Sequence, residues 1–261
     1  MTMTRALVTG GGHRLGRAMA LYLARRGCDV AVHYNTSQAA AAAVAGAVCA
    51  LGRIGVTVQA DLLDEAAVQR VLPEAAQALG GPIQVLINNA SVFERDSYAT
   101  ATRDSWDRHM ESNLRAPFVL IQALATQAPR AALDENGEPL AQALAVNMID
   151  QRVRRLTPDF TSYTIAKMGL WALTRTAAQA LAPDVRVNAI GPGPTLQGAR
   201  QSDEQFARQR AATVLHRGAN TSDITAALGY FLDAPAITGQ LLCVDGGQHL
   251  AWQTPDVVGV E

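Results

Sequence analysis

Seven short runs of β-branched and other apolar residues recur along the chain, separated by longer stretches rich in alanine and leucine. Runs that are apolar on both faces are typical of strands in a parallel sheet that helices cover on both sides. Right-handed crossovers between such strands give a Rossmann-type, doubly wound α/β fold. The predicted strands are 6–10, 30–34, 54–61, 83–90, 144–150, 185–191 and 240–247, and the predicted helices begin near Leu15, Gln38, Asp64, Arg103, Phe160 and Ser222.

A single domain accounts for residues 1–261, because a chain of this length with 49% hydrophobic residues can fill one large core. Two segments interrupt the alternation of strands and helices. Residues 129–140 are predicted to form a polar loop. Residues 194–215 are predicted to cover a substrate, because inserts beyond the carboxyl ends of the strands build ligand covers in such folds.

Charge and cysteine content argue against several classes of function. The formal net charge of −1 gives no basic footprint for nucleic acid. Cys28, Cys49 and Cys243 lack the spacing of a metal site or a disulfide framework, so buried thiols and no metal are expected. No apolar run reaches membrane-spanning length, and the N-terminus lacks a signal-peptide pattern. We expect a cytoplasmic protein that does not bind membranes.

The segment TGGGHRLGRAMA, Thr9 to Ala20, follows the first predicted strand. Its glycines allow the backbone to approach a pyrophosphate, and the helix beginning near Leu15 offers free N–H groups at its positive end. A tight turn also needs glycine when no ligand is bound. Taken alone, the segment therefore leaves nucleotide binding open.

The second predicted strand ends in HYNTS, residues 33–37, without the carboxylate that an NAD-binding domain usually carries there. Arg14 lies in the glycine turn and can reach the same corner. An arginine with short hydrogen-bond donors suits the 2′-phosphate of NADP(H). The alternative is that Arg14 is a solvated turn residue and His33 an ordinary polar residue at a strand end.

Lys167 is the only lysine of the chain and follows Tyr163 by four residues. Residues at i and i+4 share one face of a helix and can meet the same ligand. A nearby ammonium is expected to lower the pKa of Tyr163, which would then donate and accept protons near neutrality. Arginine at this position would serve both a phenol and ribose hydroxyls less well.

Taken in order, these segments resemble the short-chain dehydrogenase/reductase family over nearly the whole chain. The resemblance rests on TGGGHRLG, AD at 60–61, NNAS at 88–91, Asn113, YTIAK at 163–167, GPGPT at 191–195 and VDGG at 244–247. It implies that Asp61 contacts adenine, that the NNA segment stiffens the sheet beside the cofactor, and that Asn113 holds a water of a proton relay. It also implies that Tyr163 is the acid/base, that Lys167 binds ribose, and that the protein is a homotetramer whose tail, 248–261, approaches a neighbour's site.

Two residues depart from the family pattern: Arg14 replaces the second turn glycine, and Asp150 replaces the usual catalytic serine. Both departures, together with HYNTS, NNASVF and NMID, are similar to pteridine reductases and bacterial dihydromonapterin or dihydrofolate reductases of this family. That resemblance implies that Arg14 and Ser37 bind the 2′-phosphate, that Ser91 contacts cofactor and substrate, and that Phe93 stacks a pterin against the nicotinamide. Thr36 stands where some of these reductases have arginine, which predicts weaker phosphate affinity.

The chemistry of Asp150 favours the same substrates. An ionised aspartate cannot stabilise an alkoxide, whereas reduction of a C=N bond needs a proton on nitrogen, and a pterin offers N–H donors to a carboxylate. The alternatives are that Asp150 caps a helix or loop and that Phe93 is a core residue.

The predicted function is NADPH-dependent reduction of a dihydropteridine of the dihydrobiopterin, dihydromonapterin or dihydrofolate type. A carbonyl or 3-oxoacyl reductase and a catalytically silent cofactor-binding regulator are the alternatives. Asn113, Asp150, Tyr163 and Lys167 are the predicted catalytic residues, and Arg14, Ser91, Phe93, Asp150 and Tyr163 are predicted to contact substrate. The residues predicted to bind cofactor are Gly10, Gly12, Arg14, Leu15, Gly16, His33, Tyr34, Asn35, Ser37, Asp61, Leu62, Asn89, Ala90, Ser91, Tyr163, Lys167, Pro192, Gly193 and Thr195.

Overall fold

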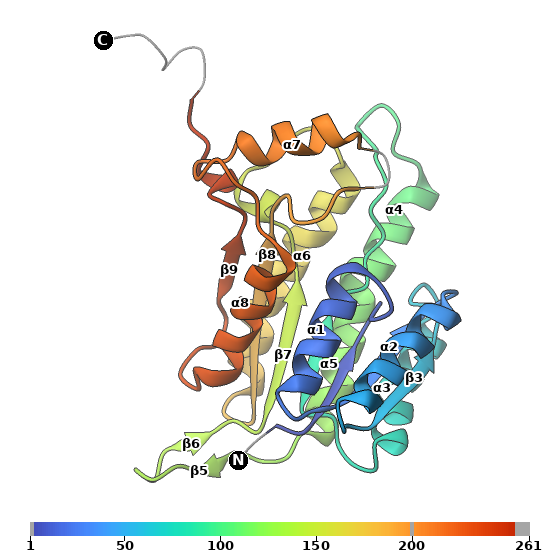
Figure 1. The fold of residues 1–261 in the computed structure, drawn as a ribbon, viewed down its shortest axis with the longest axis vertical. Helices are drawn as coiled ribbons and strands as arrows, with labels where there is room; N and C mark the ends of the chain where they lie inside the picture. Colours follow the sequence, from blue (N-terminus) through green and yellow to red (C-terminus); the bar gives the residue numbers. More distant parts are fainter. Residues whose placement is uncertain (1–2, 199–200, 254–261) are drawn as a thin grey trace.

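The computed structural model describes residues 3–198 and 201–253, and it shows a parallel sheet between two layers of helices (Figure 1). The sheet has seven strands in the order β3-β2-β1-β4-β7-β8-β9, with every pairing parallel. The predicted doubly wound α/β fold is therefore confirmed. Its strands are β1 (Arg5–Val8), β2 (Asp29–Tyr34), β3 (Gly55–Gln59), β4 (Val85–Asn88), β7 (Ala143–Met148), β8 (Val185–Pro192) and β9 (Leu241–Val244).

Each face of the sheet packs on its own group of helices. One core lies under α1 (Arg14–Arg25), α2 (Gln38–Ala50) and α8 (Thr221–Asp233). The other lies under α3 (Glu65–Ala78), α5 (Ala116–Gln127) and α6 (Thr161–Leu181). Strand β7, ALAVNM, is buried at every position because helices cover both of its faces. The remaining helical segments are α4 (Arg103–Met110), the π-helical η1 (Glu111–Arg115), the 3-10 helices η2 (Gln151–Arg154) and η3 (Gln248–Leu250), and α7 (Asp203–Ala211).

The structure corrects two local predictions, the loop at 129–140 and the ends of two strands, and it shows a helix within the predicted cover segment. Residues 129–140 contain a short antiparallel hairpin, β5 (Ala132–Leu133) with β6 (Pro139–Leu140), where a loop was predicted. The segment 194–215 contains α7, whose Ser202 and Gln205 form a reciprocal capping box. The predicted strands 83–90 and 144–150 end two residues early, at Asn88 and Met148. Residues beyond these ends turn away from the sheet and line the cavities described below.

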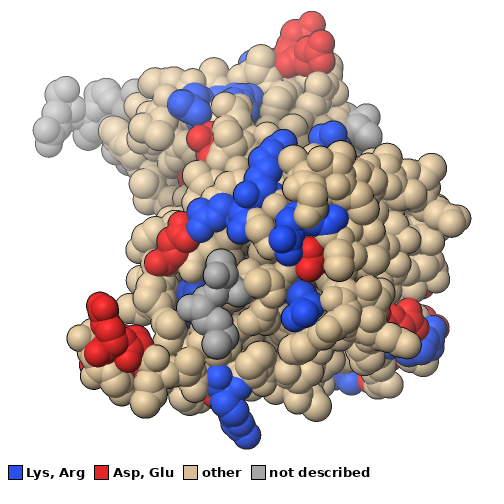
Figure 2. Space-filling view, turned by 60° about the horizontal axis from the view of Figure 1, so that its bottom comes forward, with Lys and Arg blue, Asp and Glu red and all other residues tan. Residues whose placement is uncertain are grey.

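Figure 2 turns the end of the molecule opposite α7 toward the viewer, and arginine side chains form a band across this face with carboxylates among them. Two of the arginines near the amino ends of the strands are paired, Arg26 with Asp233 and Arg53 with Asp29. None of the helices in the described part of the chain is long and apolar enough to cross a membrane.

Candidate functional site

The glycine turn after β1 opens a cleft at the carboxyl ends of the strands. Gly10 has a φ of 59°, in the left-handed region that favours glycine. A Cβ on Gly16 would lie 2.2 Å from the Gly10 carbonyl oxygen, so α1 can approach the turn this closely only with glycine there. The cleft has a volume of about 610 Å3. Its size and the N-terminus of α1 at its wall fit the pyrophosphate of a dinucleotide.

Most of the predicted cofactor residues meet at this cleft. Those that line it are Gly10, Arg14, Leu15, Gly16, His33, Asn35, Asp61, Leu62, Asn89, Ala90, Ser91, Pro192, Gly193 and Thr195. Gly12, Tyr34, Ser37, Tyr163 and Lys167 are not among the described residues of its wall. Further lining residues, which the sequence did not predict, are His13, Leu63, Val92, Arg108, Ser112 and Leu196. Arg108 and Ser112 precede Asn113 by five residues and by one residue, and this closeness in sequence to a predicted site residue was the available signal.

His33 supports the glycine turn from below. Its Nδ1 accepts from the Gly10 N–H at 3.1 Å, and its Nε2 donates to the Ala60 carbonyl at 3.1 Å. Burial lowers the pKa of His33 to about 4, so the ring is neutral at pH 7. A neutral ring with a hydrogen bond at each nitrogen shapes the cleft, and it offers no positive charge to a phosphate.

The Arg14 side chain reaches the cover segment. Its guanidinium donates to the carbonyl oxygens of Leu196 at 2.9 Å and Gln197 at 2.7 Å. Arg14 lines the cofactor cleft together with His33 and Asn35, and it also lines the cavity that contains Phe93. Its predicted contact with the 2′-phosphate, at the corner after β2, stays a prediction.

The NNAS segment is fastened to the glycine turn by Thr9. The Thr9 hydroxyl accepts from the N–H groups of Asn89 and Ala90, each at 2.9 Å. The Asn88 amide donates to Asn147 at 2.8 Å, and Asn147 donates to Thr174 at 2.9 Å. This buried polar chain joins β4, β7 and α6, and it supports the predicted stiffening role.

The predicted acid/base residues lie together where β7 ends and α6 begins. The Tyr163 hydroxyl donates to Asp150 Oδ2 at 3.1 Å. Asp150 Oδ1 accepts from the Arg152 N–H at 2.8 Å, so Asp150 also caps η2, and the capping and catalytic interpretations are compatible. Lys167 Nζ donates to the Met148 carbonyl at 2.8 Å and lies 5.7 Å from the Tyr163 ring centroid.

Burial governs protonation in this group. It raises the pKa of Asp150, and it raises the pKa of Tyr163 well above its ordinary value, with the charge of Asp150 adding to the effect. Burial lowers the pKa of Lys167 to about 8, against the opposing charge of Asp150. The expected lowering of the Tyr163 pKa by Lys167 is therefore wrong for this structure, because burial and the charge of Asp150 raise the pKa and the opposing charge is that of Arg152. Tyr163 holds its proton at pH 7 and donates it in the hydrogen bond to Asp150.

Asn113 lies in the π-helical turn η1, between α4 and α5. Its side-chain amide donates to the Val92 carbonyl at 2.8 Å, and its oxygen accepts from the Val92 N–H at 2.9 Å. The side chain thus holds the loop after β4 against the helix. Single π-helical turns occur often at functional sites.

A second cavity, of about 670 Å3, adjoins the cofactor cleft and contains Phe93 and Asp150. Phe93 stacks on Phe160 with ring centroids 4.5 Å apart, and its ring lies 4.7 Å from that of Tyr163. Phe93 is 46% exposed, so it is not a core residue. The further lining residues are Arg14, Gln151, Arg152, Phe160, Pro192, Gly193, Pro194, Leu196, Gly198, Gln201, Phe206, Gln209 and Gln248.

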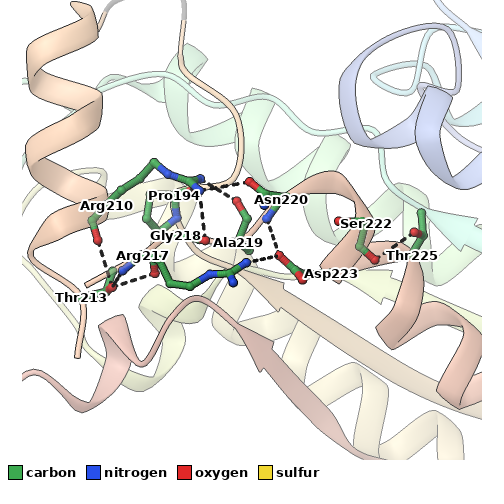
Figure 3. Close-up of polar contacts among 10 residues, drawn as sticks. All are labelled: Pro194, Arg210, Thr213, Arg217, Gly218, Ala219, Asn220, Ser222, Asp223 and Thr225. Atoms are coloured by element: carbon green, nitrogen blue, oxygen red, sulfur yellow. Dashed lines mark hydrogen bonds and ion pairs between the residues drawn. The ribbon is translucent and has the colours of Figure 1, made fainter. Parts of the chain in front are cut away.

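Helix α7 lies above the carboxyl ends of the strands (Figure 1) and contributes Phe206 and Gln209 to this cavity. Arg210 fastens the helix to its surroundings, because its guanidinium donates to the carbonyls of Pro194, Gly218 and Ala219 and to Asn220 Oδ1 (Figure 3). The predicted cover segment, apart from residues 199–200 outside the described part, is thereby tied to the start of α8. No group of three or more His, Cys, Asp or Glu suited to a metal occurs among the described residues.

Comparisons with known proteins bear on this geometry. A family model described as "Enoyl-(Acyl carrier protein) reductase" matches residues 12–249. The structure of FolM alternative dihydrofolate reductase 1 from Brucella canis, complexed with NADP, superposes with a TM-score of 0.90 at 42% identity, over 98% of this chain and 97% of that one. A 3-oxoacyl-[acyl-carrier-protein] reductase from Staphylococcus aureus is 30% identical over 96% of this chain and 100% of its own length.

A further relative is a probable galactose dehydrogenase from Rhizobium meliloti, 31% identical over 92% of this chain and 93% of its own. The names of these relatives differ in substrate, but the matches cover almost the whole chain in each case. The glycine turn, the Asn113 turn and the Tyr163–Lys167 pair lie within the region that the family model matches. The chain therefore belongs to the short-chain dehydrogenase/reductase family.

Proposed function

We propose that this chain is an NADPH-dependent reductase that converts a dihydropteridine, of the dihydrobiopterin, dihydromonapterin or dihydrofolate type, to its tetrahydro form. The observation that carries the proposal is the contact between the Tyr163 hydroxyl and Asp150 at 3.1 Å in a buried pocket. A carboxyl with a raised pKa beside a protonated phenol can deliver a proton to an imine nitrogen.

Cofactor use is supported by the cleft and by the structural relatives. The Brucella canis structure holds NADP, and a short-chain dehydrogenase from Burkholderia cenocepacia with a TM-score of 0.84 does so too. In this chain the backbone around Gly10 and α1 would hold the pyrophosphate, and Asp61 and Leu62 would border the adenine. The absence of a carboxylate in residues 33–37 favours the phosphorylated cofactor. When bound, NADPH supplies the hydride.

The residues of the chain supply the proton and the orientation. Phe93 offers an aromatic face for a pteridine ring beside Tyr163. Asp150 holds the proton that the substrate nitrogen takes. The Tyr163 hydroxyl, which donates a hydrogen bond to Asp150, stabilises the carboxylate that remains until a proton from solvent restores the acid. Lys167 keeps the end of β7 in place through the Met148 carbonyl.

A carbonyl or 3-oxoacyl reductase is the second candidate. Two observations favour it: a 3-oxoacyl reductase is 30% identical over 96% of the chain, and burial raises the pKa of Asp150, so that the protonated acid can donate to a ketone oxygen. The assembled set of Tyr163, Lys167 and Asn113 argues against a catalytically silent regulator.

An NADPH oxidation assay of the wild type and Asp150→Ser separates these functions. With dihydrobiopterin, dihydrofolate and a simple β-ketoester as substrates, we expect the wild type to reduce the pterins. The serine variant should lose pterin reduction and gain ketone reduction, because its hydroxyl donates to a carbonyl but carries no acidic proton. Wild-type activity on the ketoester alone would establish the second candidate.

We further propose a cytoplasmic homotetramer. Two separate apolar patches reach the surface: Trp106 and Ile165, on α4 and α6, are 39% and 41% exposed, and Tyr230 and Leu242, on α8 and β9, are 53% and 37% exposed. If each patch pairs with its own copy on a second chain, the two patches together generate a tetramer with two kinds of two-fold interface. Light scattering after gel filtration measures the mass, and a monomer would contradict the proposal. Residues 254–261 of the tail lie outside the described residues, so the predicted approach of the tail to a neighbour stays a prediction.

A further inference from the structure

The cavity beside Asp150 carries more positive charge than the proposed proton transfer needs. Its charged lining residues are Arg14, Asp150 and Arg152. Neither arginine forms an ion pair with a carboxylate among the described residues. Arg14 is satisfied by backbone carbonyls, which are neutral. Among the described lining residues, Asp150 is one carboxyl against two guanidinium groups.

Arg152 differs from the other basic residues of its segment, because its side chain lines the cavity and is only partly satisfied. One Nη donates to the Thr157 hydroxyl, and the guanidinium carbon lies 5.0 Å from the centroid of Phe160. Its Nε is buried and has no hydrogen-bond acceptor among the described residues. Arg152 as a whole is half-buried, but an unmatched donor at the buried Nε is costly unless an acceptor arrives.

The position of Arg152 relative to Phe93 indicates where that acceptor belongs on a substrate. Phe160 contacts both residues, because the guanidinium carbon lies 5.0 Å from its ring centroid and Phe93 stacks on it at 4.5 Å. Arg152 is therefore linked to Phe93 through Phe160, and it lines this cavity but not the cofactor cleft, whose wall includes Arg14. The amides of Gln151, Gln201 and Gln209 border the space between.

We propose that Arg152 binds a carboxylate carried on the side chain of the substrate, so that the preferred substrates are pteridines with an anionic tail. This inference rests on the proposed function. A planar guanidinium matches a carboxylate through two parallel hydrogen bonds, and the unsatisfied Nε can take part in them. The glutamine amides can pair with an amide linkage between ring and carboxylate. Dihydrofolate has such a tail, and dihydrobiopterin has a neutral one.

The test compares dihydrofolate with dihydrobiopterin in the wild type, Arg152→Gln, Arg152→Lys and Arg154→Gln. Arg154 is the matched control, because it is an exposed arginine of the same segment that packs on Trp171 and does not line the cavity. We expect Arg152→Gln to raise the KM for dihydrofolate by roughly tenfold or more and to leave that for dihydrobiopterin within about twofold. Arg152→Lys should retain part of the effect, and Arg154→Gln should change neither value.

Salt dependence and direct binding supply independent readouts. Added salt should weaken the binding of dihydrofolate to the wild type but not to Arg152→Gln, because salt screens the attraction between the guanidinium and the carboxylate. An equal rise in KM for both substrates in Arg152→Gln would show that Arg152 only supports Phe160. An unchanged KM for dihydrofolate would likewise overturn the inference.

If the wild type reduces no pterin, the proposed function fails. The inference is then decided by the binding of folate and of biopterin, which is measured by the quenching of tryptophan fluorescence. Folate binding that Arg152→Gln weakens and biopterin binding that it does not would uphold it. Weak, charge-independent binding of both would overturn it as well.

Discussion

Single residues in this site act through the protons they hold. Asp150 and Tyr163 both have raised pKa values and share a hydrogen bond, so both are protonated over a range in which an exposed aspartate would be ionised. A reductase needs such donors in their acid form when the substrate nitrogen takes up its proton.

The first prediction concerns the pH dependence of pterin reduction. The rate constant should be highest on the acid side and should fall as pH rises through the raised pKa of Asp150, because the acid form is the donor. Asp150→Asn should lower kcat by about 10²–10⁴ and abolish that decline, while NADPH affinity is preserved. A pH profile of kcat measures both effects. An asparagine variant with the wild-type profile would mean that the carboxyl carries no proton to the substrate.

Phe93 supports a second prediction at this scale. Because it is 46% exposed in the cavity, Phe93→Ala should remove an aromatic face and little core. The KM for a dihydropterin should rise severalfold, in line with stacking energies of about 0.5–1.5 kcal/mol, and the Kd for NADPH should change little. Steady-state kinetics with a thermal melt measures this. A large fall in Tm with unchanged kinetics would instead indicate packing.

At the scale of elements, Arg210 links α7 to the turn at Pro194 and to the start of α8. Arg210→Met should release the carbonyls of Pro194, Gly218 and Ala219 and lower stability by about 1–3 kcal/mol. It should also raise the substrate KM more than the NADPH Kd, because α7 carries Phe206 of the substrate cavity. Arg208→Met, at an exposed position of the same helix, is the control. Equal effects of the two variants would leave Arg210 without a special role.

The sheet and its helices could be predicted because their signals are local. Buried parallel strands are continuous apolar runs, and the YTIAK spacing places Tyr163 and Lys167 on one helical face. Phe160 and Arg152 could not be found this way, since their shared cavity depends on how the loop after β7 folds back against Phe93. The predicted shift in the pKa of Tyr163 has the wrong direction for a related reason. The i,i+4 spacing indicates that an ammonium lies nearby, but it does not indicate how deeply the phenol is buried.

For the whole molecule, His33 links stability to pH. Its pKa is about 4 in the folded chain against 6.5 for the free side chain, so the unfolded state binds the additional proton between these values. Stability should therefore be lost as pH falls from about 6.5 toward 4, by on the order of 2–3 kcal/mol from this residue. His33→Gln keeps a donor and an acceptor without titrating. Urea unfolding at pH 7 and pH 4.5 should show a correspondingly smaller loss in the variant, and equal losses would contradict the assignment.

The solitary lysine gives the chain a chemical handle that most proteins lack. Lys167 is the only side-chain amine in 261 residues, and it is 3% exposed with a pKa of about 8. Near pH 8 a substantial fraction of this amine is uncharged and nucleophilic, although access for a reagent is slow. An acylating reagent should therefore modify the chain in two stages, the terminal amine quickly and Lys167 slowly, and intact mass spectrometry would count both. NADPH should suppress only the slow stage, which turns one residue into a direct reporter of occupancy at the reaction centre.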